Sequence, residues 1–213
     1  RAEENPCFTG SGSVQEVLDA CAAYIGSNPS DKEKLVTAHS VRAMAFSAIR
    51  DLDAAISELD EAIELDATKP NPYFMRAAAQ NAKKNYDKAL ADLDEAIRRD
   101  GTHGDYFLLR GVVYRNKGDL DQAMADFDQA IRLDPNYGFA FYNRGSVWRA
   151  KGDLDHAIAD FDQAIKLDQK HAMAFYHRAF AKENKGDLRG ALEDYRAFAA
   201  LAPSNRSEEH TSE

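Results

Sequence analysis

The chain has 213 residues, of which 44% are hydrophobic and 30% are charged, a composition typical of a folded protein rather than a disordered one. Its formal net charge of -9 makes nucleic acids and anionic membranes poor partners, and no apolar run reaches the roughly 18 residues of a membrane-spanning helix. We therefore expect no nucleic-acid partner and no membrane insertion. Two cysteines are too few for a disulfide-framework miniprotein, and they lack the grouping of a zinc site.

The first 35 residues are predicted to form an N-terminal strap and half of a repeat. The chain begins without methionine, so we expect a processed or truncated form from which any export signal is gone. Residues 12–25 align with the second half of the repeats that follow, which predicts a second helix without its first. Residues 31–50 are predicted to form one lengthened helix that is capped at Ser30 or Asp31.

A sequence repeat of 34 residues organises the rest of the chain. In the third repeat the run Arg-Gly-Val-Val-Tyr-Arg-Asn-Lys-Gly-Asp-Leu-Asp-Gln-Ala is matched in the fourth by Arg-Gly-Ser-Val-Trp-Arg-Ala-Lys-Gly-Asp-Leu-Asp-His-Ala. Self-similarity at a fixed period of this length predicts an array of stacked structural repeats. The five repeats, numbered 1 to 5, are 36–69, 70–103, 104–137, 138–171 and 172–205.

Within each repeat the apolar residues follow the spacing of two helices. If the positions of a repeat are numbered 1 to 34, position 8 is always Gly or Ala, position 20 is always Ala, and positions 4 and 24 carry larger side chains. Small residues let two helix backbones approach closely, and the larger ones fill the space beside them. Between the two stripes, a pair such as Gly118-Asp119 can end one helix and cap the next. Each repeat is thus predicted to be an antiparallel helix pair.

These recurring residues resemble the tetratricopeptide repeat family, and the resemblance covers residues 36–205. The resemblance implies an all-α fold, a right-handed α-solenoid of antiparallel helix pairs, with about eleven helices in this chain. It also implies a non-catalytic scaffold, with no cofactor, that binds a protein or peptide in the concave groove lined by the first helices of the repeats.

An arginine stands at position 7 and an acidic residue at position 23 of every repeat. The turn between the helices centres near position 15, so both residues sit about 12 Å from the turn, on facing helices. We predict a ladder of Arg–carboxylate pairs that clamps each helix pair, with an anion-binding row of arginines as the alternative. The predicted pairs are Arg42 and Glu58, Arg76 and Asp92, Arg110 and Asp126, Arg144 and Asp160, and Arg178 and Asp194.

The predicted binding residues lie on the first helices, where positions 2, 5, 9, 12 and 13 point away from the packing stripe. Position 6 lies at the border of this groove surface. Together these positions combine aromatic residues with Arg and Asn, a mixture that suits peptide recognition by a few anchor residues. The alternative is that position 5 packs partly against the neighbouring repeat. The predicted groove residues are Phe74, Asn81, Leu108, Arg115, Tyr142, Asn143, Arg149, Tyr176, His177 and Asn184.

The two cysteines precede the first full repeat. Cys21 occupies a packing position of the half repeat, and Cys7 lies where the missing first helix would be. We expect a Cys7–Cys21 disulfide that ties the strap over the exposed helix, with two separate buried thiols as the alternative. A cysteine pair ahead of Arg-rich repeats is similar to exported bacterial tetratricopeptide repeat proteins. Because disulfides persist in oxidising compartments, we expect a periplasmic or secreted protein.

The sequence predicts neither a catalytic residue nor a metal site. The histidines are spread over different repeats, and no phosphate-binding loop or nucleophile motif is present. Acid pairs such as Asp160 and Asp162 recur in each second helix and are interpreted as one clamping residue beside one solvated residue.

Two other interpretations of the array remain open. One is a structural array that self-associates through the C-terminal repeat, where Tyr195, Phe198 and Ala199 would be left uncovered. The other is a repeat module cut from a larger protein. Residues 206–213 resemble the translation of a sequencing-library adapter and are interpreted as a non-native tail outside the predicted fold.

Overall fold

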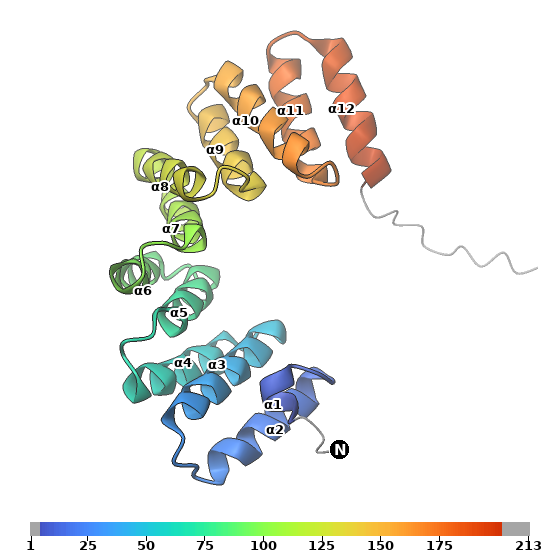
Figure 1. Ribbon diagram of the computed structural model, residues 1–213. Helices are drawn as coiled ribbons and strands as arrows, with labels where there is room; N and C mark the ends of the chain where they lie inside the picture. The colour runs from blue at the N-terminus through green and yellow to red at the C-terminus, as the bar shows by residue number, and fades with distance from the viewer. Residues whose placement is uncertain (1–4, 202–213) are drawn as a thin grey trace, which may run out of the picture. The chain divides into compact units, whose positions relative to one another are not determined.

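The computed structural model describes residues 5–201, and within that range every regular element is a helix (Figure 1). The predicted all-α fold of antiparallel helix pairs is confirmed, and none of the described helices has the length and hydropathy needed to cross a membrane. The tail at 206–213 and the end of repeat 5 lie outside the described residues. The helices are α1 (Pro6–Thr9), α2 (Val14–Gly26), α3 (Lys32–Ala48), α4 (Leu52–Leu65), α5 (Pro70–Ala82), α6 (Tyr86–Arg99), α7 (Gly104–Lys117), α8 (Leu120–Leu133), α9 (Gly138–Ala150), α10 (Leu154–Leu167), α11 (Ala172–Asn184) and α12 (Leu188–Leu201).

The described residues divide into two compact units, one ending at Asp126 and the other beginning at Phe127. In the first unit α1 packs on α2 and α3, and the pair α3–α4 is followed by the pair α5–α6 and then by α7. In the second unit α9 packs against α10 and α11 packs against α12, with α10 and α11 in contact. From α3 onward, odd-numbered helices are the first helices of the repeats and even-numbered helices are the second.

The turn inside each helix pair contains a residue with a left-handed backbone. Gly152 and Gly186 take φ values of 83° and 87°, which glycine adopts without steric strain because it has no Cβ. Arg50 and Lys84 occupy the same position in repeats 1 and 2, at φ 63° and 62°. After the glycine in repeat 4, the Asp153 side chain caps α10 by accepting a hydrogen bond from a backbone amide of its first turn.

The close approach of two helices is clearest at Gly145, at position 8 of repeat 4. A Cβ atom there would lie 2.9 Å from Cε1 of Phe161 and 3.1 Å from Cβ of Asp160, so a larger side chain requires its neighbours to move. Phe161 stands at position 24 and is fully buried. Repeats 1 and 2 instead combine alanine at position 8 with leucine at position 24, as Ala43 with Leu59 and Ala77 with Leu93.

Replacing Gly145 with alanine is expected to lower the free energy of unfolding by about 1–3 kcal/mol, because the added methyl group overpacks the contact with Phe161 and outweighs the better helix propensity of alanine. Adding Phe161→Leu should restore much of this loss, since leucine is the natural partner of alanine in repeats 1 and 2. Urea unfolding of both single variants and the double variant measures the coupling. If the two losses of stability are strictly additive, the side chains at positions 145 and 161 do not compete for the same space.

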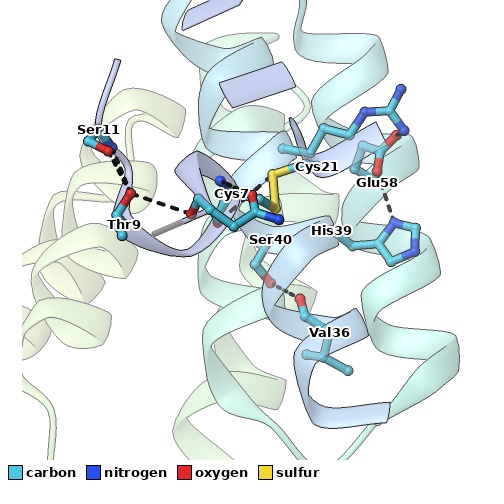
Figure 2. The surroundings of a disulfide bond; sticks show 10 residues. Cys7, Thr9, Ser11, Cys21, Val36, His39, Ser40 and Glu58 are labelled. Atoms are coloured by element: carbon cyan, nitrogen blue, oxygen red, sulfur yellow. Dashed lines mark hydrogen bonds and ion pairs between the residues drawn. A yellow bond between two sulfur atoms is a disulfide. The ribbon is translucent and has the colours of Figure 1, made fainter. Parts of the chain in front are cut away.

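The N-terminal strap contains the short helix α1, which a disulfide joins to α2 (Figure 2). The Cα atoms of Cys7 and Cys21 are 4.8 Å apart, and both residues are fully buried. Beside them the Phe8 ring meets the Tyr24 ring edge-on, with centroids 4.9 Å apart. The lengthened helix α3 begins after Asp31, whose side chain accepts a hydrogen bond from a backbone amide in the first turn. The strap therefore covers apolar side chains of α2 and α3.

Candidate functional site

The arginine at position 7 joins the two helices of its own repeat. In repeat 2, Nε and Nη2 of Arg76 donate hydrogen bonds to the two carboxylate oxygens of Asp92, at 2.9 and 2.6 Å. The carboxylates at position 23 of repeats 2 to 5 are all buried, and a planar guanidinium matches a carboxylate in this paired geometry. The same two bonds join Arg110 to Asp126, Arg144 to Asp160 and Arg178 to Asp194.

The third nitrogen of each guanidinium reaches the preceding repeat. Nη1 of Arg76 donates a hydrogen bond to Asp60 at 2.5 Å, and the equivalent bonds in repeats 3 to 5 are 2.6–2.7 Å long. The interpretation of the other acid of each pair, at position 25, as a solvated residue is incomplete, because each of these partly exposed carboxylates also binds the arginine of the next repeat. Both carboxylates lie 16 residues from their arginine, one before it and one after it, and this spacing was a signal in the sequence. The second acids are Asp60, Asp94, Asp128 and Asp162.

These contacts argue against an anion-binding row of arginines. In repeats 2 to 5 all three guanidinium nitrogens donate to carboxylates of the protein itself, which also neutralise the positive charge. Repeat 1 has a different arrangement. Nη1 of Arg42 lies 2.9 Å from one oxygen of Glu58. Nδ1 of His39 lies 2.9 Å from the other oxygen (Figure 2). His39 thus takes the packing position that an aromatic residue holds in the other repeats.

Asp194, the ladder carboxylate of repeat 5, forms ion pairs with two different cationic side chains. Besides its bonds with Arg178, its Oδ2 lies 2.9 Å from Nζ of Lys182. Burial acts to raise the pKa of Asp194, but the hydrogen bonds from Arg178 and Lys182 outweigh burial and hold the pKa below its ordinary value of 3.8.

Acid is therefore expected to weaken repeat 5. A carboxyl group whose pKa is lower in the folded state stabilises the fold fully above its unfolded pKa, near 3.8, and this contribution is lost as the pH falls through the folded pKa. Lys182→Ala should raise the pKa of Asp194 and shift the loss of stability to higher pH. Titration of the Asp194 carboxyl by NMR in both proteins measures the change, with Lys185→Ala as the control, since Lys185 pairs with Asp155 instead. An unchanged pKa in Lys182→Ala would contradict the assignment.

In the first unit, predicted groove residues make contacts between repeats. The Phe74 ring on α5 packs against Tyr106 on α7, with centroids 5.1 Å apart, as the alternative interpretation of position 5 expects. Asn81 accepts a hydrogen bond from Asn116 of α7 at 3.1 Å. These side chains therefore stabilise the stack of repeats. The other two predicted residues of this unit are half-buried: Leu108 and Arg115.

In the second unit, the prediction for Asn143 requires correction. Asn143 is only 8% exposed, and its Nδ2 donates a hydrogen bond to the backbone oxygen of Phe139 at 2.7 Å, so this side chain lies in the packing and not on a groove surface. His177, also at position 6, is half-buried with its ring 6.0 Å from that of Phe161. Tyr142 is half-buried too and packs against His171, with ring centroids 4.6 Å apart.

Exposed apolar side chains of this unit gather at positions 2, 5 and 9 of the first helices. Arg149 lies among them, with its guanidinium carbon 5.2 Å from the Phe180 ring centroid, and Asn184 is exposed one turn beyond Phe180. Phe139, Met173 and Phe180 stand at positions 2 and 9, which the sequence pattern placed away from the packing stripe, and all three are exposed. We call the set the α9–α11 stripe: Phe139 (56% exposed), Met173 (43%), Tyr176 (37%), Phe180 (39%) and Arg149.

The C-terminal repeat covers more of its aromatic residues than expected. Tyr195 and Phe198 on α12 are half-buried, because both rings pack against Tyr176 of α11, with centroids 5.9 and 5.2 Å apart. The hydroxyl of Tyr195 also pairs with Glu183 at 2.8 Å. Of the three residues expected to be uncovered, Ala199 is the one that is exposed.

Comparisons with known proteins identify the class. Family models described as tetratricopeptide repeat match residues 70–103, 105–137 and 139–171. Repeats 2 to 4 are therefore tetratricopeptide repeats, a type of repeat that generally serves as a non-catalytic scaffold for protein–protein interaction. A comparison with curated protein sequences found no significant match. Within residues 5–201, no group of three or more His, Cys, Asp or Glu side chains is placed to hold a metal ion.

Solved structures show the same fold at low sequence identity. PilF of Pseudomonas aeruginosa is 16% identical with a TM-score of 0.76, and the match covers 82% of this chain and 79% of PilF. MamA of Desulfovibrio magneticus RS-1 is 20% identical with a TM-score of 0.71, covering 83% and 98%. YrrB, described as a TPR protein with an unusual peptide-binding site, is 24% identical with a TM-score of 0.64, covering 88% and 95%. These similarities confirm the predicted α-solenoid fold.

Proposed function

We propose that the chain is a non-catalytic scaffold that binds a protein or peptide ligand on the α9–α11 stripe. The observation that carries the proposal is the exposure of four large apolar side chains on two adjacent first helices, together with Arg149. Buried aromatic and arginine side chains supply most of the energy in protein interfaces, and a soluble fold gains nothing by exposing them together.

The surroundings of the stripe suit an extended or helical apolar segment. A mostly apolar cavity of about 230 Å³ opens beside Phe139, lined also by Tyr137, Leu167 and His171, and is large enough for one side chain of a ligand. At the other end Arg149 lies over Phe180, where its guanidinium can also donate to a backbone carbonyl or a carboxylate of the ligand.

Peptide selection by phage display against the intact chain tests the proposal. For a selected peptide, Phe180→Ser and Phe139→Ser are each expected to raise Kd by about tenfold or more, because each removes an apolar anchor. Ile49→Ser is the matched control, since Ile49 is exposed to a similar extent (54%) but lies in the first unit. If the three variants bind with the same Kd as the parent protein, or if only Ile49→Ser weakens binding, the stripe is not the binding surface.

We further propose that the protein works in an oxidising compartment, periplasmic or secreted. The support is the joined pair Cys7–Cys21 in a chain that has no other cysteine. Differential alkylation of the protein in cells of its source, before and after reduction, tests the proposal. Free thiols before reduction would contradict it.

A further inference from the structure

The stacking of one repeat on the next includes two kinds of charged pair. The first is the bond from the arginine at position 7 to the aspartate at position 25 of the preceding repeat, as in Arg178 with Asp162. The second joins the lysine at position 14 to the aspartate at position 18 of the preceding repeat. These pairs are Lys83 with Asp53, Lys117 with Asp87 and Lys185 with Asp155. A second helix therefore presents two carboxylates, which receive two cations from the next repeat.

Repeat 5 reverses both charges. Its positions 18 and 25 hold Arg189 and Arg196 on α12, where the other four repeats hold aspartate. Arg189 is 93% exposed, and its ion pair is a long one of 3.4 Å with Glu193 on the same helix. Arg196 is exposed and makes no ion pair with any other residue of the described range 5–201.

The apolar part of the stacking surface is retained beside these arginines. Leu188 and Leu192 on α12 are 67% and 49% exposed. Their counterparts in repeat 4, Leu154 and Ile158, are half-buried on α10, against which α11 packs. Position 28 is isoleucine in the other four repeats and Ala199 in repeat 5, so the surface is also flatter there.

We propose that these residues dock an amphipathic helix of a partner protein that presents carboxylates where a further repeat of this type would present arginine and lysine. We call the surface the α12 face: Leu188, Arg189, Leu192, Arg196 and Ala199. Positions 7 and 14 of a first helix are about two turns apart, so the partner helix carries acidic residues seven positions apart beside an apolar stripe. Because leucines lie beside the arginines, the α12 face favours an amphipathic helix as its ligand over a simple polyanion.

Charge repulsion also disfavours the binding of helices that carry basic residues in place of the acidic ones. A repeat with arginine at position 7 and lysine at position 14 would face Arg196 and Arg189, and like charges held against each other oppose binding. A second copy of this chain offers repeats of that basic type, so it is a poor occupant. The α12 face lies on a second helix and does not include any residue of the α9–α11 stripe, so this inference does not depend on the proposed function.

Three helix-stabilised synthetic peptides test the proposal against the intact chain by fluorescence anisotropy at physiological salt. The acidic peptide has glutamates seven positions apart beside leucines, the basic peptide has lysines in their place, and the third keeps the glutamates but replaces the leucines with serine. The acidic peptide is expected to bind about tenfold more tightly than either of the others. Equal affinity for the acidic and basic peptides, or for the acidic peptide and its serine version, would overturn the proposal.

A charge-swapped protein provides the complementary test. Arg189→Asp together with Arg196→Asp restores the charges of the other repeats and should reverse the preference, so that the basic peptide binds more tightly. Lys166→Asp together with Lys170→Asp changes the net charge equally on exposed residues outside the α12 face, and should keep the original preference. An unchanged preference in the swapped protein would overturn the proposal. So would a dimer in sedimentation that the swap abolishes, because it would assign the α12 face to a second copy.

Discussion

Arg110→Ala is expected to lower the free energy of unfolding by about 3 kcal/mol, because removing one partner of a buried ion pair leaves the other charge unpaired. The variant loses two hydrogen bonds to the buried carboxylate of Asp126 and one, of 2.7 Å, to Asp94 of the preceding repeat. Both the closure of one helix pair and its stacking on the previous pair therefore weaken together. Urea unfolding followed by far-UV circular dichroism measures the loss.

Lys117→Ala is the control for this experiment. It removes an exposed ion pair between Lys117 and Asp87, which also connects two repeats. Exposed pairs of this kind contribute about 0.5 kcal/mol, so the control should be close to the parent protein in stability. The peptide affinity of Arg110→Ala should equal that of the parent protein, since Arg110 already binds the carboxylates of the ladder. A variant of normal stability that has lost ligand affinity would favour the anion-binding row instead.

Loss of the Cys7–Cys21 disulfide is expected to cost about 3 kcal/mol, the chain-entropy value for a closed loop of about 15 residues. Cys7→Ala together with Cys21→Ala frees α1, whose side chains cover the apolar faces of α2 and α3. Because each repeat contacts mainly its neighbours, the loss should be local, with faster exchange in α2 and unchanged exchange in α5 and α6.

Hydrogen exchange with mass spectrometry resolves this local effect. The oxidised parent protein, the reduced parent protein and the double variant are compared, and the last two should agree. Equal protection of α2 in all three would show that packing alone holds the strap. A uniform loss of protection along the chain would show that the array unfolds as one cooperative unit.

The sequence alone determined the helix-pair fold, because the same physical constraint recurs every 34 residues. A small residue at position 8 opposite a large one at position 24 is needed wherever two helix backbones approach closely, as at Gly145 and Phe161. The Arg–carboxylate register could also be predicted, since two residues equally far from a turn face each other on antiparallel helices. The resemblance of residues 36–205 to a known family then identified the fold class and the class of function.

The tertiary structure decided which polar and aromatic residues are available to a ligand. A helical wheel places Asn143 and Phe139 near the same edge of α9, but packing buries the first and exposes the second. The role of acids such as Asp162 was likewise hidden, because their partner Arg178 belongs to the next repeat and a pattern within one helix pair cannot show it. Periodicity determines contacts that every repeat makes in the same way. Exposure depends on the particular neighbours of each side chain, and these differ from one repeat to the next.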